Sequence, residues 1–204
     1  MIDLLISGGP VMVPIGLSSV VALAVLLERM WALRLSRVSP VAYTVEVDEL
    51  MSQGRWGDVC AVSRKSDCAA GRVLLAAVEV RHRPRAEIKE RIEEVGRREA
   101  AELERFSGAL GTIASIAPLL GLLGTVGGMI LTFDVIQTEG IGVVSSLAGG
   151  ISQALVSTMA GLTVGIPALV AHRWVLARAD AHVLRLEDLG LMALAHMTDD
   201  GEPS

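Results

Sequence analysis

The sequence predicts an all-α integral membrane protein with three transmembrane helices, and three observations predict it. First, the chain is 51% hydrophobic with a mean hydropathy of +0.53, which is more apolar than an ordinary soluble domain. Second, charged residues still make up 20% of it, too many for a chain that lies wholly in lipid. Third, the apolar residues gather in three long runs, and charged helical segments separate or follow these runs.

The first apolar run, Val11 to Leu27, reaches about 20 residues with its flanks, which is enough to cross a hydrocarbon core of ~30 Å. Pro10 and Pro14 fall in its first turns, where a helix tolerates proline best. Trp31 is a candidate anchor at the membrane interface. The chain starts without the basic region of a signal peptide. We therefore predict that residues 1–33 form a periplasmic N-terminus and a retained transmembrane helix.

Basic residues near the ends of the runs predict the orientation in the membrane. No Lys or Arg precedes the first run, whereas three Arg residues follow it. Several more precede the second run and follow the third, but residues 137–146 contain none. We therefore expect a cytoplasmic helical segment at 34–108, a periplasmic loop at 137–146 and a cytoplasmic C-terminal helix and tail at 176–204.

The segment 34–108 is predicted to be helical, with Pro and Gly residues between short helices. From Arg85 onwards a thin apolar stripe appears, and acids and bases are spaced for i,i+4 ion pairs such as Glu94 with Arg98. No strong breaker precedes Ala109, so we predict one continuous helix from this stretch into the second run. The stripe has two interpretations: a solvated face, or a surface that packs on the short helices or on a neighbouring copy.

The C-terminal segment 176–204 is predicted to be an amphipathic helix that ends in an acidic tail at 199–204. Three histidines at wide spacings lie in or next to this segment, and we expect them to be solvent-exposed: His172, His182 and His196. Cys60 and Cys68 lack the spacing of a metal site, so we expect two reduced thiols, no metal and no cofactor.

The second and third runs, 109–136 and 147–175, form a hairpin around which the chain is organised. The polar stretch Asp134–Glu139 is expected to form its turn. Small residues recur at steps of three and four on both helices, a spacing that lets helices approach closely in lipid. Because they cover more than one face of each helix, they favour an oligomer. The glycines expected to pack the helices are Gly121, Gly124, Gly128, Gly161 and Gly165.

Uncharged polar side chains also lie in the hairpin. A Ser or Thr in a membrane helix usually bonds to its own backbone one turn back, and this simple interpretation covers most of them. Gln153 differs, because an amide needs several partners in hydrocarbon. At about 100° per residue, Gln153 aligns with Ser157, and Thr158 aligns with Gly161. A helix with two such polar stripes is expected to face protein or a water-lined path.

The sequence contains no catalytic constellation: no Ser-His-Asp set, no paired acids in the apolar runs and no HExxH motif. The net charge of -5 is mild and does not favour nucleic-acid binding. We expect a conduit or a force-transmitting assembly, not an enzyme.

Long motifs in the hairpin resemble a known family. SIAPLLGLLGTVGGMILTF at 115–133, followed by GGISQALVSTMAGLTVGIPALVAHR at 149–173, resembles the MotA/TolQ/ExbB proton-channel proteins, and most closely the ExbB/TolQ branch. The stretches ERMWAL at 28–33 and RREAAELERFSGALGTIASIAPLLG at 97–121 are similar to that branch too. The resemblance extends from about Val11 to Ala193.

The resemblance implies a pentameric ring in the bacterial inner membrane, around a dimer of a single-span partner similar to ExbD or TolR. Such complexes use the proton-motive force to drive the partner's periplasmic part, and thereby a TonB-like or TolA-like protein. A Thr in the GTVxG motif and a Thr in the third span line the pore of the family. By motif these are Thr125 and Thr158, and we take Gln153 and Ser157 as further pore-lining residues on the predicted proton path.

One departure from the family motif concerns the proton route. Many ExbB and TolQ proteins have Glu where this chain has Gln153, and a glutamine cannot ionise, although it can hydrogen-bond water or a carboxyl group. The charge-bearing step must then rest on the partner, or the path must differ. Two alternatives to a motor subunit stay open. One is a passive scaffold for single-span partners without ion flux, and the weaker one is an autonomous channel.

Overall fold

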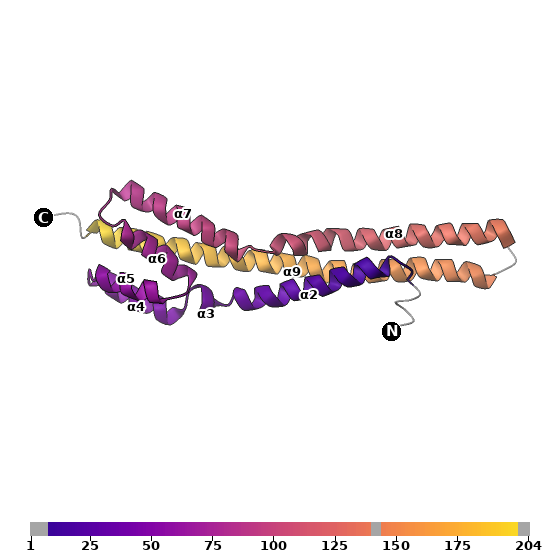
Figure 1. Cartoon of the computed structure of the whole chain (residues 1–204), viewed down its shortest axis with the longest axis horizontal. Coiled ribbons are helices and arrows are strands. Elements are labelled where there is room, and N and C mark those ends of the chain that lie inside the picture. Colours follow the sequence, from indigo (N-terminus) through magenta and orange to yellow (C-terminus); the bar gives the residue numbers. More distant parts are fainter. Residues whose placement is uncertain (1–7, 140–143, 200–204) are drawn as a thin grey trace. The chain divides into compact units, whose positions relative to one another are not determined.

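A computed structural model describes residues 8–139 and 144–199. This part of the chain contains helices and turns and no β-strand, which confirms the predicted all-α class. Figure 1 labels the helices, which are α2 (Met12–Ala32), α3 (Leu35–Val38), α4 (Val41–Ser52), α5 (Trp56–Lys65), α6 (Ala69–Glu79), α7 (Arg85–Leu103), α8 (Ser107–Glu139) and α9 (Val144–Asp199).

Three helical stretches are long and apolar enough to cross a membrane: Met12–Ala32, Arg85–Thr138 and Ala148–Thr198. They contain the three predicted runs. At 1.5 Å per residue, the 33 residues of α8 extend about 50 Å and the 56 residues of α9 about 84 Å. Both helices are longer than a hydrocarbon core of ~30 Å requires.

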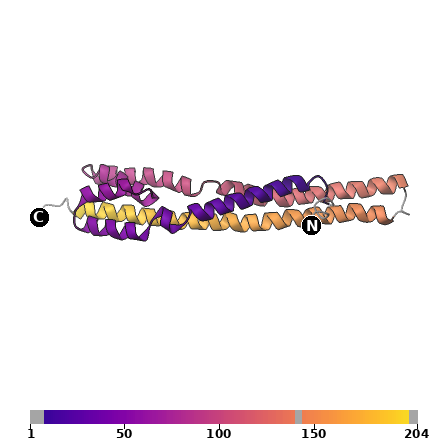
Figure 2. The same ribbon diagram turned by 60° about the horizontal axis from the view of Figure 1, so that its bottom comes forward.

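The described residues form two compact units. The first, which we call the span unit, contains residues 8–28, all of α8 and α9 up to Trp174. In both views α8 and α9 lie side by side and run antiparallel (Figures 1 and 2). Many large apolar side chains point outward, such as Leu155 at 67% exposure and Leu119 at 61%. A surface this apolar suits contact with lipid or with other membrane helices.

The second unit, which we call the bundle unit, contains residues 29–105 and α9 from Val175 to its end. Its core is aliphatic, with Val47, Val59 and Leu74 fully buried. The apolar stripe of α7 packs inside the chain: Ile88 and Leu103 are buried, and Ile92 lies against Gly190 of α9. Of the two interpretations of the stripe, packing within the chain is therefore the one that the structure supports.

Ion pairs stabilise the outer surface of α7 and its contact with α6. The predicted pair of Glu94 with Arg98 is present at 2.6 Å, and Arg91 binds the other oxygen of Glu94 at 2.6 Å. The pKa of Glu94 is lowered mainly by the hydrogen bond from Arg91 and, to a smaller extent, by the positive charge of Arg98. Toward the core, Arg72 of α6 forms a two-pronged pair with Glu99 at 2.6 Å. The two-pronged geometry fixes the relative rotation of α6 and α7.

The prediction of one continuous helix from residue 85 into the second run is wrong, because the helix is interrupted between the end of α7 at Leu103 and the start of α8 at Ser107. Phe106 adopts the left-handed conformation, with φ of 62°. The buried guanidinium of Arg29 donates from Nη1 to the carbonyls of Glu102, at 3.1 Å, and Leu103, at 3.3 Å. In an uninterrupted helix these carbonyls would accept from the N–H groups four residues later. Arg29 therefore satisfies the end of α7 and allows the break.

The turn of the hairpin also differs from its prediction. The polar stretch Asp134–Glu139 is not a turn, because α8 remains helical to Glu139. The helix continues through these polar residues, and the hydroxyl of Thr138 donates to the carbonyl of Asp134, one turn back. The middle of the predicted loop, 140–143, lies outside the described residues, as does the tail beyond Asp199.

The predicted exposure of the histidines is wrong for His182, which is 1% exposed in the bundle unit. Its Nε2 lies 2.9 Å from the carbonyl oxygen of Leu33, just beyond the end of α2. A carbonyl only accepts, so Nε2 carries a proton, and in the neutral ring Nδ1 is then an unprotonated acceptor. Nδ1 is buried and has no hydrogen-bond partner among the described residues. Burial lowers the pKa of His182, and the nearby charges of Arg178 and Arg185 lower it further.

Lowering the pH should destabilise the bundle unit through His182, which lies in the charged part of α9 beyond the apolar run. The pKa of His182 is lower in the folded protein than in the unfolded chain, where it is about 6.5. The neutral side chain therefore contributes its full stabilisation of the fold above about pH 6.5, and this contribution is lost as the pH falls below that value. We expect the Tm of the purified protein to fall between about pH 7.5 and about pH 5.5. His182→Gln keeps a donor for Leu33 but cannot titrate, so its Tm should change less. An equal pH dependence in both proteins would contradict this role.

Candidate functional site

The candidate site is the contact between α8 and α9 in the span unit, which we call the seam. Residues at steps of three and four place one face of each helix against the other. On α8 this face is buried at Ala117, Gly121, Gly124 and Gly128. On α9 it is buried at Ala154, Ser157, Gly161 and Gly165. The structure thus places all five predicted packing glycines on one shared surface.

The backbones touch along the seam because these positions lack side chains. A Cβ atom added to Gly161 would lie 2.5 Å from the carbonyl oxygen of Ala117 and 3.0 Å from the Cα of Gly121. One added to Gly128 would lie 2.6 Å from the carbonyl oxygen of Gly150. At Gly124 the space is taken by the side chain of Ser157. Such contact supplies the dispersion energy that holds helices together in lipid, where the hydrophobic effect does not.

Two hydroxyl groups of α9 bond across the seam to α8. Ser157 is fully buried. Its Oγ donates to the carbonyl of Ala154 in the same helix at 2.9 Å, and also lies 3.4 Å from the carbonyl oxygen of Gly121 in α8, as a weaker second acceptor. Thr158 Oγ1 donates to the same carbonyl of Gly121 at 3.2 Å. Its bond crosses to the other helix, so the simple own-backbone interpretation does not describe it. Gly121 makes this possible because it brings its carbonyl close to α9.

The other hydroxyls follow the simple interpretation. Thr125 Oγ1 donates to the carbonyl of Leu122 at 2.6 Å, and Thr163 Oγ1 donates to that of Met159 at 2.7 Å. Thr125 and Thr158 are both half-buried, beside the glycine faces. A hydroxyl that donates its single proton keeps oxygen lone pairs. These oxygens can accept a hydrogen bond from water or from a protonated carboxyl group.

Gln153 lies against a different part of the span unit. Its amide packs over Gly9, in the turn before α2, where a Cβ atom on Gly9 would collide with it. Gly9 has a φ of 72°, so the chain can make this turn with a glycine at little cost. Gln153 and Ser157 share a stripe on α9, as predicted, but Ser157 faces α8 and Gln153 faces the start of α2. The structure does not bring the four predicted pore-lining residues into one cluster.

Charge is missing from the middle of the seam. No Asp, Glu, Lys or Arg occurs at 107–133 or 148–172. His172 lies at the end of this stretch, where its Nδ1 lies 2.9 Å from the carbonyl oxygen of Ser107 and therefore donates to it. The described residues also contain no group of three His, Cys, Asp or Glu side chains that could hold a metal ion. The seam can therefore offer hydrogen bonds to a titrating group, but it contributes no carboxylate of its own.

Sequence reasoning missed one part of the seam, near the ends of the two helices. Thr132 is 5% exposed, and its Oγ1 donates to the carbonyl of Gly128 at 2.9 Å. It fills the space beside Gly150, where a Cβ atom would collide with its hydroxyl. The signal was present in the sequence: Thr132 follows Gly128 by four residues and so continues the same face.

Comparison with known proteins matches this arrangement to one family. A model of the MotA/TolQ/ExbB proton channel family matches residues 65–188. A putative biopolymer transport protein ExbB-like 1 from Synechocystis is 33% identical over 181 residues, which cover 85% of this chain and 69% of that protein.

Two further relatives carry the names of both branches. A putative biopolymer transport protein ExbB homolog from Methanothermobacter thermautotrophicus is 29% identical over 182 residues, 89% of this chain and 64% of that protein. The Tol-Pal system protein TolQ of Pseudomonas aeruginosa is 36% identical over 83 residues, 41% of this chain and 36% of that protein.

Two neighbouring glycines of α8 provide a matched test of the seam. Gly128→Ala should destabilise the protein by roughly 1–3 kcal/mol, because the new methyl group overlaps the backbone of α9. Gly127→Ala should be neutral or slightly stabilising, because nothing lies within 4 Å of that position and alanine favours a helix. Thermal unfolding in detergent measures both. Equal effects of the two substitutions would show that the helices do not pack through Gly128.

Proposed function

This chain belongs to the MotA/TolQ/ExbB proton channel family, on its ExbB/TolQ branch, and we propose that it is the proton-channel subunit of an inner-membrane motor. In this proposal several copies, five by family resemblance, surround a dimer of a single-span ExbD/TolR-like protein. The complex uses the proton-motive force to move that partner. Its periplasmic part then acts on a TonB-like or TolA-like protein, or in a related motor.

The observation that carries the proposal is the seam: two membrane helices in backbone contact, with uncharged hydroxyl groups beside the contact and no acid at 107–133 or 148–172. Thr125 and Thr158 present oxygen lone pairs at half-buried positions. A protonated carboxyl group on a partner helix could donate to either one. Neither threonine holds a negative charge or a proton tightly, so the carboxyl group would be free to move on and ionise again.

The roles of the four predicted pore-lining residues then differ. Thr125 and Thr158 contact the partner's carboxyl group. Ser157 sets the spacing of the helices, because it is fully buried between them. Gln153 hydrogen-bonds water or a partner near the start of α2, but it cannot relay a proton by titrating. The titrating group is thus supplied by the partner, and the protein is a channel and motor subunit without enzymatic chemistry.

The energy available is sufficient for such a step. One proton that crosses a potential of 100 mV releases about 2.3 kcal/mol. This exceeds a single exchanged hydrogen bond of ~1 kcal/mol, so each proton could drive the partner past one set of threonines. The proposed orientation, with the N-terminus periplasmic and the C-terminus cytoplasmic, follows from the basic residues beside the apolar runs.

A passive scaffold for single-span partners is the second candidate. Gln153 favours it, because the seam then offers no acid of its own at 107–133 or 148–172 to relay a proton by titrating. The two candidates differ in their dependence on the proton gradient. Dissipating the gradient with a protonophore should abolish the energised process if the chain is a motor subunit, and should leave a scaffold's function unchanged.

Replacing the two threonines tests the proposal directly. Thr125→Val and Thr158→Val keep the side-chain shape and remove the hydroxyl group. We expect each to lower the energised process in cells on the order of tenfold, the effect of losing one hydrogen bond of ~1.5 kcal/mol along the path. Thr163→Val is the matched control: its hydroxyl bonds to its own backbone as that of Thr125 does, but it is exposed and is not among the predicted path residues. Full activity in both test variants, with normal assembly, would exclude the hydroxyl-lined path.

A further inference from the structure

Three exposed arginines of the bundle unit lie near the end of the first membrane helix, and the proposed channel function does not use them. Arg34 and Arg37 follow α2, and Arg178 lies on α9. We call these three residues the arginine cluster. None of them makes an ion pair within the described part of the chain. Asp180, the nearest acid to Arg178 along α9, is two positions away and therefore lies about 200° around the helix.

One hydrogen bond brings the two parts of the arginine cluster together. His182 Nε2 lies 2.9 Å from the carbonyl oxygen of Leu33, the residue before Arg34. The end of α2 and this part of α9 run in the same direction (Figures 1 and 2), so the turn of α9 before His182 lies beside the last turn of α2. Arg178 precedes His182 by four residues and shares its face. Burial lowers the pKa of His182, and the nearby charge of Arg178 lowers it further.

An apolar surface adjoins the arginine cluster where the first span ends. The span is Met12–Ala32, and its last turn exposes Met30 at 49% and Trp31 at 52%. The guanidinium of Arg37 stacks over the Trp31 ring, 3.3 Å from its centre. The ring attracts the cation, while the N–H groups of the guanidinium remain in its own plane and can bind an oxyanion. Anion donors and an apolar surface therefore lie next to each other.

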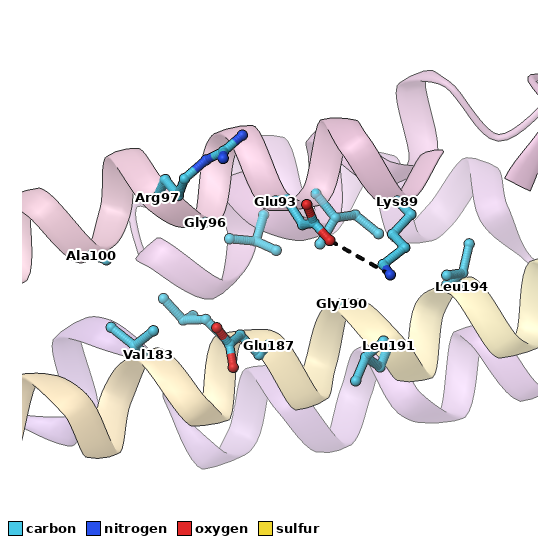
Figure 3. A pocket seen from close by; sticks show the side chains of 13 residues that line it. Lys89, Glu93, Gly96, Arg97, Ala100, Val183, Glu187, Gly190, Leu191 and Leu194 are labelled. Atoms are coloured by element: carbon cyan, nitrogen blue, oxygen red, sulfur yellow. Dashed lines mark ion pairs between the residues drawn. The ribbon is translucent and has the colours of Figure 1, made fainter. Parts of the chain in front are cut away.

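Other basic residues of the bundle unit have acids beside them. Figure 3 shows the groove between α7 and α9, in which Lys89 pairs with Glu93 at 3.7 Å. Further along α9, Arg185 lines a hollow together with Asp48 and Asp188. The arginine cluster differs from both places, because its charges have no such acidic neighbours and lie beside the end of a membrane span.

We propose that the arginine cluster binds the headgroup of an anionic phospholipid, whose acyl chains lie against Met30 and Trp31. A phosphate group accepts strong hydrogen bonds from guanidinium groups, often from two N–H groups at once. A phosphate held by both Arg34 and Arg178 joins the end of α2 to α9. The lipid thus stabilises this contact from outside the protein. This inference is independent of proton conduction.

The position of the cluster favours a lipid over a soluble anion. A soluble phosphate gains only exposed charge contacts, which are weak and are screened over ≈ 8 Å at physiological ionic strength. A phospholipid is held in the bilayer by its acyl chains, so its phosphate is present at a high local concentration. Next to a membrane surface, each arginine favours an anionic lipid by about fivefold, and three arginines together by about 100-fold.

Quenching of Trp31 fluorescence by brominated lipids measures binding next to the cluster. Trp56→Phe and Trp174→Phe leave Trp31 as the only tryptophan of the full chain. The purified protein is reconstituted in phosphatidylcholine nanodiscs that contain increasing fractions of brominated phosphatidylglycerol or brominated phosphatidylcholine. The ratio of the two apparent affinities is the preference for the anionic headgroup, which we expect to exceed about tenfold.

Substitutions in this single-tryptophan protein assign the preference to the cluster. Arg34→Gln and Arg178→Gln should each lower it about fivefold, because each removes one charged donor. Arg185→Gln is the matched control. It removes the same charge from the same face of α9, but beside Asp48 and Asp188, so the preference should change less than about twofold. Arg34→Lys and Arg178→Lys keep the charge and should keep most of the preference, which would separate lost charge from a folding defect.

Three results would overturn the lipid site. One is equal quenching by the two brominated lipids. Another is a loss in Arg34→Gln and Arg178→Gln that is no larger than in Arg185→Gln, or that lysine does not restore. The third is displacement of brominated phosphatidylglycerol by millimolar inorganic phosphate at constant ionic strength, which would assign the cluster to a soluble anion.

Discussion

The close contact between the backbones of α8 and α9 is the constraint on which the membrane part of this protein depends. In lipid, the hydrophobic effect does not drive two helices together. Their association must instead be stabilised by dispersion contacts and hydrogen bonds, both of which act only at short range. Gly161 and Gly121 allow that range, since a single added Cβ at Gly161 would overlap the backbone of α8. The same closeness brings the carbonyl of Gly121 within 3.2 Å of the Thr158 hydroxyl, so packing and the proposed chemistry have one geometric cause.

Hydrogen bonds to helix-end carbonyls recur where the helices of each unit begin or stop. In the bundle unit, Arg29 takes two carbonyls at the end of α7, and His182 takes that of Leu33 beyond α2. In the span unit, His172 takes that of Ser107 at the start of α8. A carbonyl without a helical partner must be satisfied when it is buried. Arg29 and His182 meet that need, and they allow α2 and α7 to end while α9 continues without interruption, whereas the carbonyl of Ser107 lies in the first turn of α8 and can also accept within that helix.

The family assignment and the structure constrain function in different ways. Membership of the MotA/TolQ/ExbB family establishes the class of protein, and the seam supplies a physical reason why such a chain would depend on a partner's acid. The seam, at 107–133 and 148–172, contains hydroxyl groups and an amide but no carboxylate, so it can guide a titrating group and cannot replace it. Gln153 strengthens this reasoning, because the structure holds it against Gly9, away from the cross-seam bonds of Ser157 and Thr158.

The sequence by itself determined the helical class, the three apolar runs and the glycine faces, because hydropathy and the 3.6-residue period are local properties. It could not determine where α7 ends, because that break depends on Arg29, a residue more than 70 positions away. It likewise missed the burial of His182, which follows from the distant carbonyl of Leu33, and the separation of Gln153 from Ser157, which depends on where α2 begins. Helical periodicity reveals which residues share a face, but only tertiary packing decides which neighbour that face meets.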